Sequence, residues 1–210
     1  MTDVPQHTPR APRLKRRRIE SIFQLSLVVL GALLAMGFSQ WKEQRNDRNR
    51  MQTALASIRS ELQSNRDEVL RAQRYHASLA DRFDRLQQQG ATQPGWEDFP
   101  QGLLSPARVV STAWHSSLTT GAAAQLPYSQ LLALSNVYET QGSYARLSDA
   151  LLASTYQDLM RSGAPQLLDR YANFAPVQRD FSGKESELLQ VYDRALQALD
   201  GGAQARTTTP

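Results

Sequence analysis

The feature that most constrains this chain is a stretch of 21 residues, 21–41, that contains no charged side chain. As an α-helix rising about 1.5 Å per residue it would be about 31 Å long, which matches the roughly 30 Å hydrocarbon core of a bilayer. The stretch ends at Trp41, whose side chain is of the type that favours a membrane–water interface, and it reads SIFQLSLVVLGALLAMGFSQW. We therefore expect an uncleaved single-pass transmembrane helix over residues 21–41.

Two other interpretations of this stretch stay open. A buried helix of a soluble protein is disfavoured because a dense basic cluster, residues 15–18, comes directly before it. A cleaved signal peptide would account for the small residues of Ala35-Met36-Gly37. However, Phe38 follows them, and the apolar run is longer than in most signal peptides.

The positive charge of the chain is concentrated before this stretch. The formal net charge is +4, from 24 basic and 20 acidic residues, and the first 20 residues contain six basic and two acidic ones, so the other 190 carry 18 of each. A basic face on the folded body, as in nucleic-acid-binding proteins, is therefore not expected. Residues 1–20, with three prolines, are predicted to form a disordered basic arm in the cytoplasm. The remainder is expected outside the cytoplasm, although residues 42–59 carry five basic residues on the opposite flank.

Residues 42–89 contain neither proline nor glycine, so we expect one long juxtamembrane helix. Eleven of its positions follow a 4-3-4-3 spacing, and nine of them are apolar: Met51, Leu55, Ile58, Leu62, Asn65, Val69, Ala72, His76, Leu79, Phe83 and Leu86. The stripe could form a parallel dimer, with Asn65 as its polar residue and Gly31 and Ala35 extending it into the bilayer. The favoured alternative is that it packs on later helices of its own chain.

The rest of the chain is predicted to be helical. Residues 90–105, rich in proline and glycine, are expected to be a linker ending in a helix-capping Ser105-Pro106 pair. Residues 106–200 are expected to pack on the juxtamembrane helix as three to four helices, at 106–120, 127–161, 165–174 and about 176–199. Residues 201–210 are expected to be a disordered tail. The predicted class is therefore an all-α bundle continuing from a membrane helix.

Short motifs within this pattern resemble those of an uncharacterised family of bacterial single-pass membrane proteins. The motifs are Trp41-Lys42-Glu43, then an L..I..EL..N helix (Leu55, Ile58, Glu61-Leu62, Asn65), Ala113-Trp114 with Leu118 and Gly121, and Val137-Tyr138. The resemblance covers most of residues 21–199. It implies a location in the bacterial cytoplasmic membrane and a helical extramembrane domain, and it implies no activity.

The residue types that catalysis and metal binding need are sparse. The chain has no cysteine and three histidines, and it lacks the H-E-x-x-H, nucleotide-loop and G-x-S-x-G motifs. Acidic residues between 67 and 84 alternate with arginines, a pattern typical of surface ion pairs. We therefore expect no enzymatic activity, no metal and no cofactor.

The remaining candidates are residues suited to contact. Val110, Ala113, Trp114, Ser117 and Leu118 are predicted on the inward face of their helix. Trp114 either anchors the core beside the Gly121 turn or lines a groove for a ligand or partner. The candidate interaction residues are Trp114, His115, Leu118, Asn65, Gly31 and Ala35.

Three functions fit this sequence. The favoured one is a membrane-anchored scaffold whose helical domain contacts an unidentified protein partner or a second copy of itself. The alternatives are a sensory domain that binds a small ligand and signals through another protein, and an accessory subunit of a membrane complex.

Overall fold

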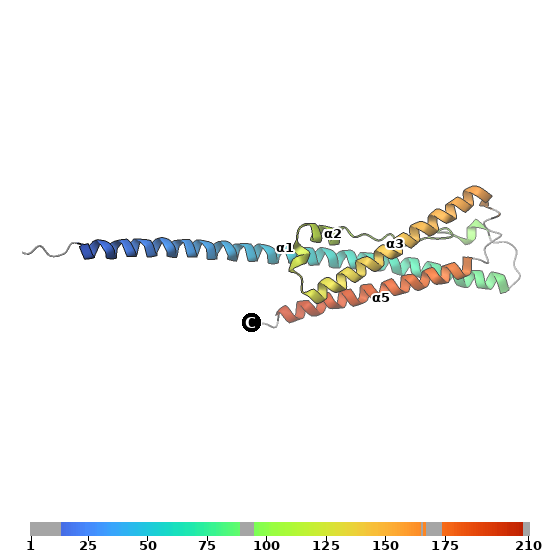
Figure 1. Ribbon diagram of the computed structural model, residues 1–210. Coiled ribbons are helices and arrows are strands. Elements are labelled where there is room, and N and C mark those ends of the chain that lie inside the picture. Colours follow the sequence, from blue (N-terminus) through green and yellow to red (C-terminus); the bar gives the residue numbers. More distant parts are fainter. Residues whose placement is uncertain (1–13, 89–94, 165, 167–173, 208–210) are drawn as a thin grey trace, which may run out of the picture. The chain divides into compact units, whose positions relative to one another are not determined.

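The computed structural model describes residues 14–88, 95–164, 166 and 174–207, and among these all regular structure is helical, with no strand. Side chains are described from residue 27 to 201, apart from these gaps and residues 28 and 32. The elements in chain order (Figure 1) are α1 (Leu14–Gln88), η1 (Trp96–Asp98), α2 (Thr112–Thr119), η2 (Ala122–Gln125), α3 (Tyr128–Ser162) and α5 (Phe174–Thr207). The all-α class expected from the sequence is confirmed.

The chain divides into two compact units after Arg48, and α1 contributes residues to both. In the first unit the backbone is helical from Leu14 onward. Its strongly apolar side chains between residues 27 and 41 are exposed, and the Arg45 guanidinium lies 5.6 Å from the centre of the Trp41 ring. Among the described residues, none of the helices has the length and apolarity required of a membrane span. The expected span, 21–41, includes eight residues whose side chains lie outside that description.

The second unit is a bundle of three long helices: the later part of α1, α3 and α5 (Figure 1). Ion pairs and hydrogen bonds between α1 and α5 run in opposite chain order, from Arg59–Asp200 through Arg66–Asp193 to Asp84–Arg179. These two helices are therefore antiparallel. Two hydrogen-bonded pairs between α1 and α3, Glu61–Tyr138 and Asn65–Gln141, run in the same order, so these helices are parallel.

The apolar stripe of α1 is the core of this bundle. Nine of its eleven predicted positions are buried, and Leu55 and Leu86 are half-buried. The stripe packs with the predicted face of α5, where Leu188, Tyr192 and Ala195 are at most 1% exposed. A heptad pattern predicts an apolar face but does not predict which helix packs on it. Here the helices that pack on it come from the same chain.

The end of the predicted linker differs from the expectation. Ser105-Pro106 does not begin a helix, because α2 begins only at Thr112. Residues 101–111, which we call the strap, have no helix, and the carbonyl and amide groups of several strap residues are bonded to side chains of the three long helices. These tertiary hydrogen bonds replace the ones that a first helical turn would have made, so the local helix-start signal is overridden.

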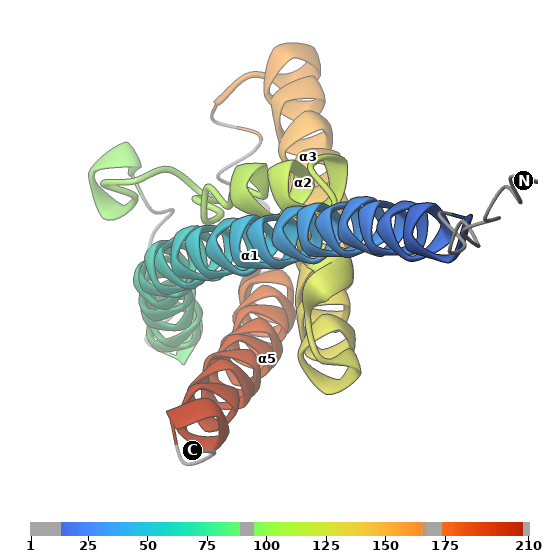
Figure 2. The ribbon, with the colours of Figure 1, turned by 90° about the vertical axis from the view of Figure 1, so that its left-hand side faces the viewer.

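The C-terminal ends of α2 and α3 agree with the prediction. The stops at Gly121 and Gly163 are confirmed, since both glycines have positive φ angles, 74° and 79°, which residues with a Cβ rarely adopt. Gly142 does not interrupt α3. No residue of α3 after Ser148 is buried, and Figures 1 and 2 show this part of α3 leaving the other two helices.

Two terminal segments differ from the prediction, and a third segment lies mostly outside the described residues. α1 begins at Leu14, inside the arm expected to be disordered, where leucine, lysine and arginine are good helix formers. α5 continues to Thr207, through a pair of glycines and most of the predicted tail, because alanine, glutamine and arginine support a helix there. The short helix predicted at 165–174 lies mostly outside the described residues.

Candidate functional site

The candidate site is the region where the strap and α2 meet α1 and α3. Asn65, expected in an apolar stripe, lies at its centre and is 1% exposed. Its side-chain oxygen accepts from the Val110 amide at 3.0 Å, and its side-chain nitrogen donates to the Val110 carbonyl at 2.7 Å. Asn65 thus satisfies both backbone groups of one strap residue, as a neighbouring strand would.

A second amide completes this layer. The side-chain nitrogen of Gln141 also donates to the Val110 carbonyl, at 2.9 Å, and its oxygen accepts from Asn65 at 3.1 Å and from the Tyr192 hydroxyl at 2.6 Å. Burial raises the pKa of Tyr192, and the Glu61 carboxylate raises it further. All three long helices therefore contribute to holding one peptide unit of the strap. Asn65 is buried and hydrogen-bonded within its own chain.

The start of α2 is held by a carboxylate from another helix. Ser111 precedes α2 and makes no side-chain capping bond. Instead Glu61 of α1 accepts from the amides of Ala113, at 2.8 Å, and Trp114, at 3.4 Å. A negative charge at this end also complements the helix dipole. Glu61 therefore caps α2 across the bundle.

The same carboxylate anchors an aromatic pair. The Tyr138 hydroxyl donates to Glu61 at 2.7 Å, and burial together with this bond raises the pKa of Tyr138 far above its ordinary value. The Trp114 ring stacks on the Tyr138 ring, with centroids 5.2 Å apart and planes 3° apart. At 7% exposure Trp114 is a core residue, which agrees with the first of its two predicted roles.

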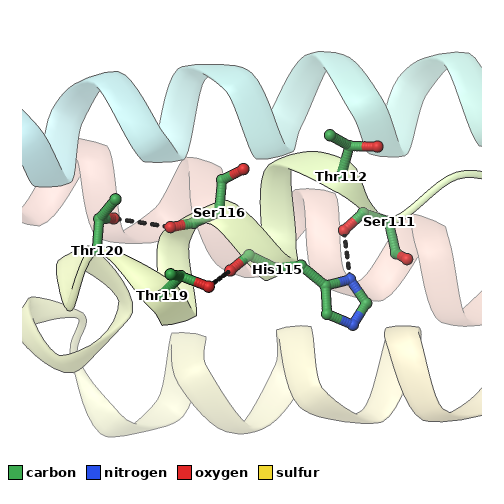
Figure 3. A pocket seen from close by; sticks show the side chains of 6 residues that line it. All are labelled: Ser111, Thr112, His115, Ser116, Thr119 and Thr120. Atoms are coloured by element: carbon green, nitrogen blue, oxygen red, sulfur yellow. Dashed lines mark hydrogen bonds between the residues drawn. The ribbon is translucent and has the colours of Figure 1, made fainter.

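The outward side of α2 presents the other two predicted residues of this helix. His115 is exposed, and its Nδ1–H donates to the Ser111 carbonyl at 2.7 Å (Figure 3). Leu118 is 49% exposed and Val110 47%, so the prediction that both face inward is wrong. Their backbone positions are set by bonds that the helical pattern does not contain, namely the Glu61 cap and the strap.

Two hollows lie on either side of His115. One, of about 470 Å³, runs along α2 and is lined mainly by hydroxyl groups (Figure 3): Ser111, Thr112, His115, Ser116, Thr119 and Thr120. The hydroxyls of Thr119 and Thr120 donate to the carbonyls of His115 and Ser116, four residues earlier. The other hollow, of about 460 Å³, lies between α2 and α3, with Trp114, Tyr138 and Glu139 among its lining residues.

Gly31 and Ala35 belong to the first unit, unlike the other four candidates. Both are exposed, and a Cβ added at Gly31 would meet no atom within 4 Å. The dimer face that these two small residues would form stays a prediction.

Sequence reasoning missed several residues that hold the strap and α2: Glu61, Tyr138, Gln141, Tyr144, Gln178 and Glu185. A signal for some of them was present. Gln141 follows Tyr138 by three residues and Glu185 precedes Leu188 by three, so both lie in register with apolar faces. A polar side chain in such a register needs a buried partner.

The described residues contain no group of three histidine, aspartate or glutamate side chains placed to hold a metal ion. No known protein family matches the chain, and no curated protein or solved structure is detectably similar to it. The function must therefore be argued from the geometry of the chain itself.

Proposed function

We propose that this protein is a membrane-anchored helical scaffold that acts by protein–protein contact and not by turnover. The observation that carries the proposal is the exposure of the first unit. Eight apolar side chains between Leu27 and Trp41 are each 51–66% exposed, so none of the described residues covers them. Burying a large apolar side chain is worth about 1.5–3 kcal/mol, and a lipid bilayer would supply that burial.

The proposed anchor is the helix over residues 21–41, in the cytoplasmic membrane of a bacterium. The dense basic cluster at 15–18 supports a cytoplasmic N-terminus. Trp41, with the Arg45 guanidinium over its ring, supports a membrane–water interface at the other end, because an indole and a cation both favour that position. The bundle would then lie outside the cytoplasm.

The test of the anchor is extraction of the full chain from membranes. Vesicles from expressing cells are washed with alkaline carbonate and then with high salt, and we expect the intact chain in the pellet after both washes. A reporter fused to the C-terminus, active only outside the cytoplasm, should be active. Release of the intact chain by carbonate contradicts the anchor, and activity of a cytoplasmic reporter contradicts the orientation.

The proposed contact surface is the outward side of α2. His115 and Leu118 are both exposed there, and His115 borders the hollow between α2 and α3. The α2 amides beneath them are bonded to Glu61 in the interior. A partly apolar face over a fixed support suits a protein partner, since little order is lost on binding. The partner is either a second copy of the chain or another membrane-associated protein.

A photoreactive amino acid at Leu118 tests this surface, with the same group at exposed Gln197 of α5 as the matched control. We expect a crosslinked product in cells from position 118 and none from position 197. The mass of the product identifies the partner: twice the chain mass indicates self-association, and a stoichiometric membrane protein indicates an accessory subunit. Products of equal yield at both positions, or none at 118, contradict the proposed surface.

A second candidate function, a ligand-binding sensory domain, is favoured by the hollow between α2 and α3. Its volume, about 460 Å³, is within the range of small-molecule sites, and its lining combines an aromatic pair with His115 and Glu139. A rise in melting temperature with one compound of a metabolite panel would support sensing. The rise should disappear in Ser135→Trp, which fills the hollow, and persist in Asn136→Trp, which lies outside its lining.

A further inference from the structure

The strap is held at its middle by a buried histidine. His76 of α1 is 0% exposed. Its Nε2 atom lies 3.1 Å from the Ser105 amide nitrogen, and its Nδ1 atom lies 3.0 and 2.9 Å from the two carboxylate oxygens of Glu185 on α5. The edge of its ring meets Phe181, with centroids 4.9 Å apart. The imidazole is thus fixed on both of its nitrogen atoms.

These contacts determine where the ring proton lies. A backbone amide can only donate, so Nε2 must offer its lone pair to Ser105. The single proton of the neutral ring is then on Nδ1 and is donated to Glu185. The neutral form of His76 is therefore the one that the strap requires.

A second bond from the same carboxylate reaches the strap. The Tyr144 hydroxyl of α3 donates to Glu185 at 2.9 Å and accepts from the Ala107 amide at 2.8 Å. Burial and the Glu185 carboxylate raise the pKa of Tyr144, so it stays a phenol. The Glu185 carboxylate thus supports two strap amides. It supports Ser105 through His76 and Ala107 through Tyr144.

A second proton on the ring reverses one of these contacts. The only place for it is Nε2, where it would become a donor facing the Ser105 N–H, also a donor, at 3.1 Å. The contact with Glu185 would become an ion pair at the same time. The titratable groups that face the ring are Glu185 from α5, Tyr144 from α3 through that carboxylate, and Tyr75 from α1 itself. Protonation therefore opposes the strap while it favours the contact between α1 and α5.

We propose that His76 is a proton-operated latch: uptake of one proton by its ring releases the Ser105 segment of the strap, while Asn65 still holds Val110 and the three long helices stay packed. The sign follows from linkage, because the released state binds a proton that the latched state excludes. The latch is closed at neutral pH and opens as the pH falls. This inference does not depend on the proposed function, since it concerns only the bundle and its strap.

The test is amide hydrogen exchange of the full chain in detergent micelles at pH 7.5 and pH 5.5, corrected for the intrinsic effect of pH. Because the released state holds one more proton than the latched state, the protection of Ser105 should fall, by at most about a hundredfold over these two pH units. The buried α5 amide of Ala195 serves as the internal control, and its protection should not change. Unchanged protection of Ser105 contradicts the latch, and a parallel loss at Ala195 shows general unfolding instead.

The matched variant is His76→Gln, whose side chain carries one acceptor and one donor but does not titrate. We expect its Ser105 protection to be independent of pH over the same range, and an equal fall in the variant would contradict the latch. If the variant does not fold, the imidazole resonances of His76 in the wild-type chain replace it. They should titrate in step with the loss of Ser105 protection, and titration without that loss overturns the proposal.

Discussion

The two parts of α1 carry apolar side chains in different arrangements. Between residues 27 and 41 eight large apolar side chains are each more than half exposed. From Met51 to Phe83 they follow one narrow stripe, and nearly all of them are buried by α3, α5 and the segment between α1 and α3. One continuous helix thus contains a segment whose apolar surface is uncovered by the chain and a segment whose apolar surface is fully used.

This difference shows what each part requires from its surroundings. A stripe with polar residues on its other faces needs partner helices on one side only, and the chain provides them. The exposed apolar side chains of the first part have no such partner among the described residues, and they are the basis of the proposed anchor. The second part of α1 therefore packs within its own chain, and the first part is the one for which we propose a membrane.

The largest effect is expected when charged side chains are placed in the first part of α1, between residues 27 and 41. Leu30→Arg combined with Leu33→Arg should release the chain from membranes, because each arginine at the centre of a span costs roughly 2.5–3.5 kcal/mol. The measurement is the fraction of the chain in the carbonate-resistant pellet. The control is Gln52→Arg with Ser57→Arg, at exposed positions of the second part, and it should leave that fraction unchanged. Retention of the doubly charged first-part variant would contradict the proposed anchor.

The packing around the second part of α1 can be tested at Trp114 of α2, which lies in the same core. Trp114→Ala should lower the free energy of unfolding by about 3–5 kcal/mol, because it leaves a cavity beside Tyr138. Urea unfolding followed by circular dichroism in micelles measures the change. Leu118→Ala, four residues further along α2 and 49% exposed, should change it by at most about 0.5 kcal/mol. Equal effects would mean that Trp114 is not a core residue.

Asn65, one of the two polar residues of the stripe, should have an intermediate effect when it is replaced. Asn65→Ala leaves the Val110 amide without its acceptor, which should cost about 1–3 kcal/mol of unfolding free energy. The Val110 amide should also exchange faster, while amides of α5 stay protected. Asn49→Ala, at an exposed position of the same helix, is the control and should have no measurable effect. Unchanged exchange at Val110 would show that Asn65 does not hold the strap.

The smallest effect is expected at the surface of the second part. The Arg66 guanidinium lies 2.6 Å from Asp193, and this hydrogen bond raises the pKa of Arg66. Both side chains are about a third to a half exposed, so the pair should contribute at most about 1 kcal/mol. A double-mutant cycle with Arg66→Ala and Asp193→Ala measures this coupling, which should shrink as salt is added. A coupling above about 2 kcal/mol would place the pair in a drier environment.

Much of the helical layout could be predicted because its signals are local. The stripe of α1, the stops at Gly121 and Gly163 and the apolar face of α5 each depend on residues a few positions apart. The strap could not be predicted in this way. Ser105-Pro106 is a sound helix-start signal, but Asn65, His76 and the residues around them offered the backbone stronger partners.

The candidate site was predicted only in its outline. Trp114 and Asn65 were identified, yet Glu61, which caps α2 and binds the Tyr138 hydroxyl, was known only as part of a motif. Its role depends on Ala113, 52 positions away in the chain, and on Tyr138, 77 positions away. No periodic pattern records such a pairing, because the two ends belong to different helices.

The amino-acid sequence by itself determined that the chain is helical, where α2 and α3 end and which face of the long helices is apolar. These features could be predicted because spacing and capping act between near neighbours. Only the tertiary structure decided which helices cover the stripe, how the strap replaces a helix, and which side chains bind its backbone. Those choices depend on hydrogen bonds and packing between distant segments, which arise only when the helices are assembled.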